Sequence, residues 1–226
     1  MPTCWICGAF ADSSEHMVKA SDIRGVYGRI TNTKPVFRHS REYRNEVIPG
    51  SKSDKLKFAP SLCTYCNSTR TQPHDRAWER FSGYLRERTP HITAGARIPL
   101  KEIFHTDCQV SMKRVHLYFV KLFGCYAVEY KVPLPINHFA LCILNENPNP
   151  NLRLSFVHIS QASPKYGILV NHINALNVGG KTVSASWFYI VGVVGVLLSY
   201  TEPGHPRLNK HNGWHPDDIS PSIRMA

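Results

Sequence analysis

The sequence predicts an α+β protein with a cysteine-rich N-terminal part and a strand-rich C-terminal part. Two Cys-x-x-Cys pairs fall in the first third of the 226 residues, at positions 4 and 7 and at positions 63 and 66. Apolar side chains recur at helical spacing between residues 75 and 88, whereas residues 152–159 alternate apolar and polar side chains. The first pattern is typical of an amphipathic helix and the second of a strand with one buried face. We therefore expect two domains, residues 1–90 and residues 91–226.

Composition supports a folded, basic protein. Hydrophobic residues make up 42% of the chain, which is enough for a core, and the net charge is +11 with a sequence pI near 9.4. A basic chain suits a polyanion, so DNA is the expected partner, and a merely basic protein is the alternative. Seven cysteines, an odd number, argue against a disulfide framework and for a reducing compartment. We expect a cytoplasmic protein with no signal peptide and no membrane contact.

The elements follow the same patterns along the chain. A short helix is expected over 17–29, and another begins at the second cysteine pair, carries Asn67 and ends at Pro73. His74 or Asp75 is then expected to cap the helix of residues 75–88. Residues 89–99 are predicted to be a linker because Pro90, Gly95 and Pro99 interrupt them. A further helix is predicted over 100–124, and strands are predicted over 139–144, 152–159, 167–170 and 187–200.

The four paired cysteines predict a structural zinc site. A gap of two residues lets both sulfur atoms of a pair face one ion, and two pairs supply the four thiolates of a tetrahedral site. Cys4, Cys7, Cys63 and Cys66 are the expected ligands. Four thiolates leave no open position for water, so we expect this zinc to stabilise the fold and not to catalyse a reaction.

Three further residues in the same region predict a second, catalytic metal site. Glu15 and Asn67 can offer oxygen ligands to a hard cation such as Mg²⁺ or Mn²⁺. His16 follows Glu15 and can accept a proton from a water molecule at neutral pH. Phosphodiester hydrolysis needs a cation and an activated water, so the set predicts a nuclease. The alternative is that Glu15 and His16 are a solvated pair in a loop.

This order of motifs resembles the HNH endonucleases of the ββα-metal class. Cys-x-x-Cys, an acid followed by His, and Cys-x-x-Cys-Asn are similar in particular to the zinc-containing branch that includes phage recombination endonuclease VII. The resemblance covers the first 70 to 90 residues. It implies that Glu15 and Asn67 bind the catalytic metal, that His16 is the general base, and that hydrolysis leaves a 5′-phosphate and a 3′-hydroxyl.

The sequence departs from that family in three places. Glu15 stands where Asp is commoner, and it is longer by one methylene group. The family's middle Asn should fall near Phe58, where residues 57–60 contain no Asn. The interval between His16 and Cys63 is also long, which we interpret as an insertion over 31–57.

Several basic side chains are candidates for nucleic-acid contact. Arg70, Arg76 and Arg80 follow Asn67, and Lys57 lies in the insertion. A solvated helix face is an equal alternative for the three arginines. His74 is a further candidate for contact with phosphate, with helix capping and metal binding as alternatives.

Two other functions stay open at this stage. The missing middle Asn favours a non-catalytic zinc module that binds nucleic acid. A third hypothesis is an interaction protein in which residues 91–226 bind a further partner, and a homodimer is compatible with each hypothesis. Near the C-terminus, residues 212–218 are predicted to form a turn with Trp214 packed on the sheet, with a binding loop as the alternative.

Overall fold

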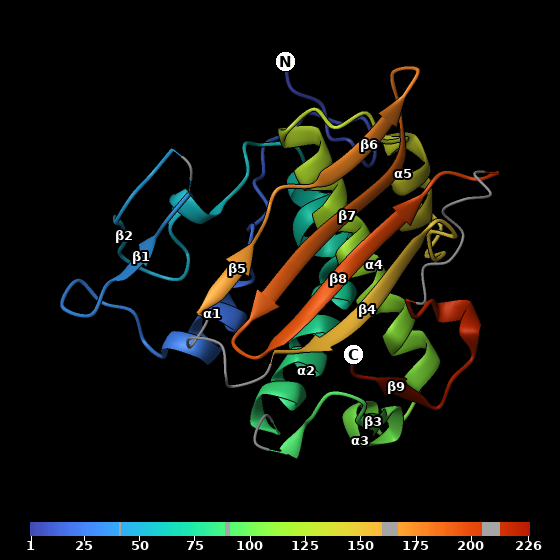
Figure 1. Cartoon of the computed structure of the whole chain (residues 1–226). Helices are drawn as coiled ribbons and strands as arrows, with labels where there is room; N and C mark the ends of the chain where they lie inside the picture. Colours follow the sequence, from blue (N-terminus) through green and yellow to red (C-terminus); the bar gives the residue numbers. More distant parts are fainter. Residues whose placement is uncertain (41, 89–90, 160–166, 205–212) are drawn as a thin grey trace.

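A five-stranded antiparallel sheet forms one layer of the protein, and three helices lie behind it (Figure 1). The computed structural model describes residues 1–40, 42–88, 91–159, 167–204 and 213–226. The sheet order is β4 (Leu152–His158), β8 (Val194–Thr201), β7 (Lys181–Val191) and β5 (Ile168–Val170), and β6 (Asn174–Val178) also pairs with β7. The helices behind the sheet are α2 (Gln72–Glu87), α4 (Cys108–Glu129) and α5 (Ile136–Leu144).

Smaller elements surround these two layers. Helix α1 (Ala20–Tyr27) lies next to α2, and α3 (Leu100–Phe104) precedes α4. Two short antiparallel pairs lie outside the main sheet: β1 (Val36–Arg38) with β2 (Glu46–Ile48), and β3 (Arg97–Pro99) with β9 (Ser222–Arg224). The described residues also include a π-helical segment, η2 (Tyr65–Arg70), and the 3₁₀ segments η1 (Asp54–Leu56) and η4 (Pro216–Asp218).

One hydrophobic core spans both sides of the predicted domain boundary. Helix α4 is apolar around nearly its whole circumference, and such a helix is buried on all faces. Trp78 of α2 stacks on Tyr118 of α4 at 5.5 Å between ring centroids, and Tyr189 of β7 packs edge-on to Trp78. The N-terminal part is therefore joined to the sheet through α2 and α4.

The predicted mixture of helices and strands is confirmed, and most helices lie where expected. Helix α1 lies within the predicted range 17–29, and α2 overlaps the predicted range 75–88. Strands β4 and β5 match the strands predicted over 152–159 and 167–170. The helix predicted over 100–124 is interrupted, because His105 and Asp107 adopt positive φ values of 60° and 50° between α3 and α4. Of the predicted linker, residues 89 and 90 lie outside the described residues.

Two strand predictions were wrong. Residues 139–144 belong to α5, and the buried side chains Phe139, Ala140 and Ile143 share one helical face. A short apolar run has no clear period, so its sequence does not separate a strand from a buried helix. The single strand predicted over 187–200 is a hairpin of β7 and β8, in which Gly192 adopts the left-handed φ of 64° needed to reverse the chain.

The capping predictions around Pro73 were also wrong. Pro73 lies in the first turn of α2, where its missing N–H costs no hydrogen bond, and does not end the preceding helix. Thr71 occupies the N-cap position of α2, so neither His74 nor Asp75 caps it. At the other end of the chain, Trp214 pairs with Leu154 and its ring packs near Phe156, which agrees with the predicted turn; Asn212 lies outside the described residues.

Among the described helices, none is long and apolar enough to cross a lipid bilayer.

Candidate metal and catalytic site

The four paired cysteines meet at one point. Their sulfur atoms all lie within 4.8 Å of one another, and the Sγ atoms of Cys7 and Cys63 are 3.6 Å apart. A tetrahedral site with four Zn–S bonds places its sulfur atoms about 3.8 Å apart, so this spacing fits a metal ion. The cluster can therefore hold a structural metal, as the Cys-x-x-Cys spacing predicts.

The backbone holds the two cysteine pairs in register. The N–H of Cys4 donates to the carbonyl of Ala9 at 2.7 Å, and the N–H of Trp5 donates to the carbonyl of Ser61 at 3.1 Å. Gly8 adopts a left-handed φ of 78°, which closes the first turn without strain. These bonds fix the first pair against the segment that leads into the second.

Without a cation, the four thiols share one small space. Hydrogen bonding from the N–H of Ala9 lowers the pKa of Cys7 to about 7, whereas burial raises the pKa of Cys4 and of Cys66. Within the part of the chain that the structure describes, the polar partners of these sulfur atoms are one another and backbone N–H groups. A divalent cation is the group that would stabilise several thiolates at this point.

Glu15 and His16 lie on an extended segment that pairs with the chain before the second cysteine pair. Three backbone hydrogen bonds join the two segments, at distances between 2.8 and 2.9 Å. The N–H groups of Ser13, Phe58 and Met17 donate to the backbone carbonyls of Leu62, Glu15 and Leu56, respectively. Residues 13–17 and 57–62 thus run antiparallel, with isolated bridges between Ser13 and Leu62 and between His16 and Lys57. A helical segment follows at once, because η2 begins at Tyr65.

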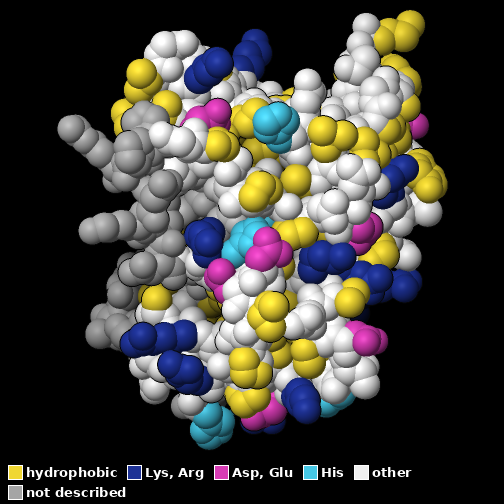
Figure 2. Space-filling model, turned by 90° about the vertical axis from the view of Figure 1, so that its right-hand side faces the viewer, with side chains coloured by type: hydrophobic (Ala, Val, Ile, Leu, Met, Phe, Trp, Pro, Cys, Tyr) yellow, Lys and Arg dark blue, Asp and Glu magenta, His cyan; other side chains and the backbone are white. Residues whose placement is uncertain are grey.

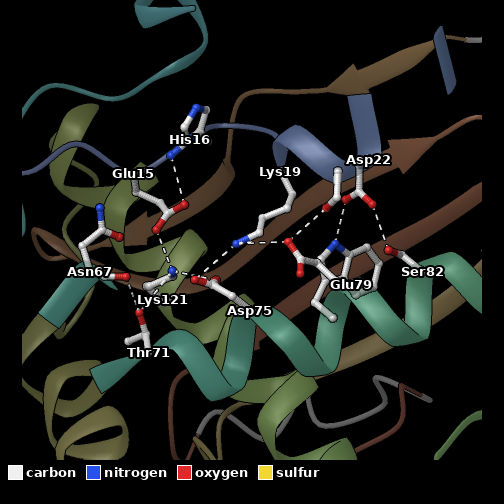
Figure 3. Close-up of polar contacts among 12 residues, drawn as sticks. Glu15, His16, Lys19, Asp22, Asn67, Thr71, Asp75, Glu79, Ser82 and Lys121 are labelled. Carbon is white, nitrogen blue, oxygen red and sulfur yellow. Dashed lines mark hydrogen bonds and ion pairs between the residues drawn. The ribbon is translucent and has the colours of Figure 1, made fainter. Parts of the chain in front are cut away.

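Asn67 faces the segment that carries Glu15 and His16. Its Nδ2 donates to Oγ of Ser13 at 2.9 Å and to the carbonyl of Ser14 at 3.2 Å. The side chain therefore braces the loop just before Glu15. The structure brings the three predicted catalytic residues into one neighbourhood (Figure 3).

A buried lysine that the sequence analysis did not consider reaches Glu15. Nζ of Lys121, in α4, lies 2.6 Å from Oε2 of Glu15, 2.9 Å from Oδ1 of Asp75 and 3.3 Å from Oγ1 of Thr71. The side chain of Lys121 is fully buried, and that of Glu15 is 6% exposed. Burial disfavours the ammonium, yet the two carboxylates outweigh this effect, so the pKa of Lys121 is raised.

This ion pair changes what Glu15 offers to a metal. Its Oε1 accepts a hydrogen bond from the N–H of His16 at 3.0 Å, and its Oε2 accepts one from Lys121. A carboxylate and an amide oxygen suit a hard cation, so the donor set fits Mg²⁺ or Mn²⁺ in its chemistry. The carboxylate is already neutralised, however, and a divalent ion at Oε2 would have to replace the ammonium.

His16 points away from the ion pair (Figure 3). Burial lowers its pKa, and the positive charges of Lys57, Lys19 and Lys121 act in the same direction, while Glu15 acts against them. Its ring is therefore neutral at pH 7. Among the described residues, Nε2 of His16 is buried and has no hydrogen-bond partner, so it has an unused capacity to accept or donate.

Of the predicted nucleic-acid contacts, His74 is buried, whereas the basic side chains are partly or fully exposed. His74 is fully buried and its Nε2 lies 2.7 Å from Oε1 of Glu146, so it is not a surface contact. Arg80 donates from Nε to the carbonyl of Ile103 at 2.7 Å. Arg76 is exposed, Arg70 covers the ring of Tyr65, and Lys57 pairs with Asp54 at 2.8 Å. On the face seen in Figure 2, basic side chains are scattered among acidic and apolar ones and form no single patch.

A separate cavity of about 670 Å³ lies beside this region. Its lining comes from the segments around β1, β5 and the C-terminal end of α4, including Met17, Leu56, Tyr126, Tyr130 and His172. Among the described residues, its lining does not include Glu15, His16 or Asn67. The cavity is thus distinct from the predicted catalytic residues.

The sequence did contain a signal for Lys121. It is the only Lys, Arg, Asp or Glu between Val115 and Val128. A single charge within an apolar helix implies a buried partner, because an unpaired buried charge is too costly. The sequence could not name Glu15 or Asp75 as that partner.

No protein-family model matches this chain, and no match is found among curated proteins or among solved structures. The resemblance to the HNH endonucleases therefore stays an expectation carried by the motifs.

Proposed function

We propose that this protein is an HNH-type, metal-dependent endonuclease that hydrolyses phosphodiester bonds in DNA. One observation carries the proposal. Two antiparallel bridged segments, residues 13–17 and 57–62, and the helical segment from Tyr65 bring Glu15, His16 and Asn67 together beside the four-cysteine cluster. Two paired segments followed by a helical segment agree with the ββα order that the resemblance implies.

The four-cysteine cluster is proposed to hold zinc. Its sulfur spacing supports a tetrahedral thiolate site, and thiolates select zinc over the harder divalent ions. The zinc would fix Asn67, which follows Cys66 directly, and hence the loop that Asn67 braces. Its role in the proposal is structural.

The proposed chemistry assigns one task to each residue. Glu15 and the amide oxygen of Asn67 would hold Mg²⁺ or Mn²⁺, which supplies charge stabilisation to the phosphate and the leaving oxygen. His16, with a free ring nitrogen, would take the proton from the attacking water. Arg70, Arg76 and Lys57 would give sequence-independent contacts with phosphates.

A second candidate function is supported by the Lys121–Glu15 ion pair. With Glu15 neutralised by an ammonium, the same scaffold could bind nucleic acid without cleaving it. The structure supports this candidate through the closed ion pair alone, and the motif set supports the nuclease.

A plasmid-nicking assay separates the two. The full chain is incubated with supercoiled plasmid and Mg²⁺ or Mn²⁺, beside His16→Ala and a control, His138→Ala, at an exposed position on α5. The nuclease proposal expects nicking by the parent, a loss of roughly 10²–10⁴-fold in His16→Ala and no change in His138→Ala. Binding of plasmid without nicking, by the parent and both variants, would leave the binding module as the function.

A further inference from the structure

Lys121 sits in a cage of oxygen atoms at the predicted catalytic centre. Its ammonium contacts Oε2 of Glu15, Oδ1 of Asp75 and Oγ1 of Thr71, all within 3.3 Å, and no part of the side chain is exposed. These are the kinds of oxygen atom that a hard cation takes as ligands. The chain thus supplies its own cation to Glu15 (Figure 3).

That cation comes from outside the segment that carries the HNH-like motifs. Lys121 belongs to α4, whereas the motifs end at Asn67 and the resemblance ends by residue 90. Helix α4 packs against α2 through Tyr118 and Phe119, which contact Trp78, and against the C-terminal sheet through Phe119, which contacts Tyr189. The part of the chain beyond the motifs therefore supplies the positive charge that pairs with Glu15.

We propose that Lys121 is a built-in competitor of the divalent metal at Glu15. The ammonium closes the site, and a divalent ion binds only when Lys121 gives up Glu15. This inference rests on the proposed function for its biological meaning, but its physical content is a cation competition at one carboxylate.

The geometry makes this exchange local. When Glu15 turns away, the ammonium keeps Asp75 and Thr71 as partners, so it is not left unpaired in the core. Asp75 is itself paired with Lys19 at 3.2 Å, and Lys19 also lies 3.7 Å from Glu79. These groups form a chain of alternating charges in which Glu15 is the end member next to His16.

The experiment measures Mn²⁺ binding to the full, zinc-loaded chain by electron paramagnetic resonance, together with the Tm at each Mn²⁺ concentration. The test variant is Lys121→Met, which keeps an unbranched side chain one atom shorter than that of Lys and removes its charge. The matched control is Lys19→Met, which removes an ammonium that pairs with Asp75 and Glu79 but not with Glu15. The double variant Glu15→Gln/Lys121→Met shows whether any new binding occurs at Glu15.

We expect Lys121→Met to bind Mn²⁺ at least about tenfold more tightly than the parent, because a positive charge within a few ångströms of the ion is gone. Its Tm should rise with Mn²⁺, since a ligand that binds only the folded state stabilises it. Lys19→Met should match the parent, and the double variant should lose the gain. A folded Lys121→Met with the Mn²⁺ affinity of the parent would overturn the proposal.

The unmodified protein provides a second test that does not depend on the folding of Lys121→Met. Tight, micromolar Mn²⁺ binding to the parent that disappears in Glu15→Gln would also overturn the proposal, because no competition would then be acting. Nicking activity is scored separately. Gain of Mn²⁺ binding in Lys121→Met without nicking by either protein would refute the nuclease proposal and leave the competition standing.

Discussion

Two clusters of ligand-type side chains lie close together in the N-terminal part, and they differ in how their negative charge is balanced. The four cysteines face one another, and their sulfur atoms contact other sulfur atoms and backbone N–H groups. Glu15 and Asp75, in contrast, share the buried ammonium of Lys121. The first cluster needs an external cation to hold several thiolates, whereas the second already contains one. Ligand chemistry alone therefore does not make a metal site; the local charge balance decides whether the site is open.

The largest expected effect is on the four-cysteine cluster. Cys63→Ser removes one of four thiolates, and metal binding to such a site is part of the folding free energy, on the order of 10 kcal/mol for a structural zinc. We expect loss of zinc and unfolding of the region around residues 1–70. Zinc content and a thermal melt measure this effect. Cys108→Ser, outside the cluster, is the control, and equal zinc content in both variants would show that the cluster does not hold the metal.

Loss of the Glu15 carboxylate from the cluster around Lys121 should lower the stability of the protein without changing its zinc content. Glu15→Gln leaves Lys121 buried with one carboxylate fewer, and breaking a buried pair from one side costs about 3 kcal/mol. Glu79→Gln is the matched control, because its carboxylate lies 3.7 Å from Lys19 and is 41% exposed. A surface pair of this kind contributes at most about 1 kcal/mol. Chemical denaturation gives both values, and equal losses in the two variants would contradict a buried, stabilising ion pair.

Helix α4 also carries a buried base, His116, that has no opposite charge beside it among the described residues. His116 lies on α4, five residues before Lys121, and its Nε2 hydrogen-bonds the carbonyl of Leu152 at 3.0 Å. Burial lowers the pKa of His116 to about 3, whereas the carboxylates raise that of Lys121. The same helix thus keeps one base neutral and another charged, and the difference is whether a carboxylate faces it.

This difference predicts a pH dependence of stability. Between pH 6.5 and 3 the unfolded chain binds a proton at His116 that the folded chain does not, so stability is full above pH 6.5 and falls as the pH decreases. The loss between pH 7 and pH 5 should be about 2 kcal/mol. His116→Gln should flatten this slope, and His138→Gln, at an exposed site, should not. An unchanged slope in His116→Gln would show that other groups cause it.

The sequence predicted the elements whose cause is local. Two features could be recognised from local sequence patterns. One is the spacing of the four cysteines, which depends on a single ion, and the other is the apolar stripe of α2, which depends on a single helix. The helix α5 was mistaken for a strand because its apolar run has no period that separates the two. The ion pair of Lys121 could not be found, because its partners Glu15 and Asp75 lie on other elements and only the packing of α4 brings them together.

The smallest expected effect concerns the side chain that lies between the two clusters. Asn67 follows the last cysteine, and its Nδ2 holds the loop before Glu15 through Ser13 and Ser14. Asn67→Ala should therefore lower the free energy of unfolding by about 1 to 2 kcal/mol, the usual cost of losing part-buried hydrogen bonds. Zinc content should not change, because no thiolate is removed. Ser68→Ala, which loses one exposed bond to the carbonyl of Thr64, is the control and should cost less.

The same variant tests whether the two clusters are coupled. If Asn67 only starts a helix, Asn67→Ala will match Ser68→Ala in stability, and Mn²⁺ will have the same effect on both. If it braces the loop, hydrogen exchange of the N–H groups of Ser13 and Met17, which donate to Leu62 and Leu56, should become faster in Asn67→Ala alone. A local increase with zinc retained would mean that the thiolate cluster positions Glu15 through this one amide. An increase that also reaches the N–H of Cys4 and Trp5 would mean instead that the cysteine cluster itself has loosened.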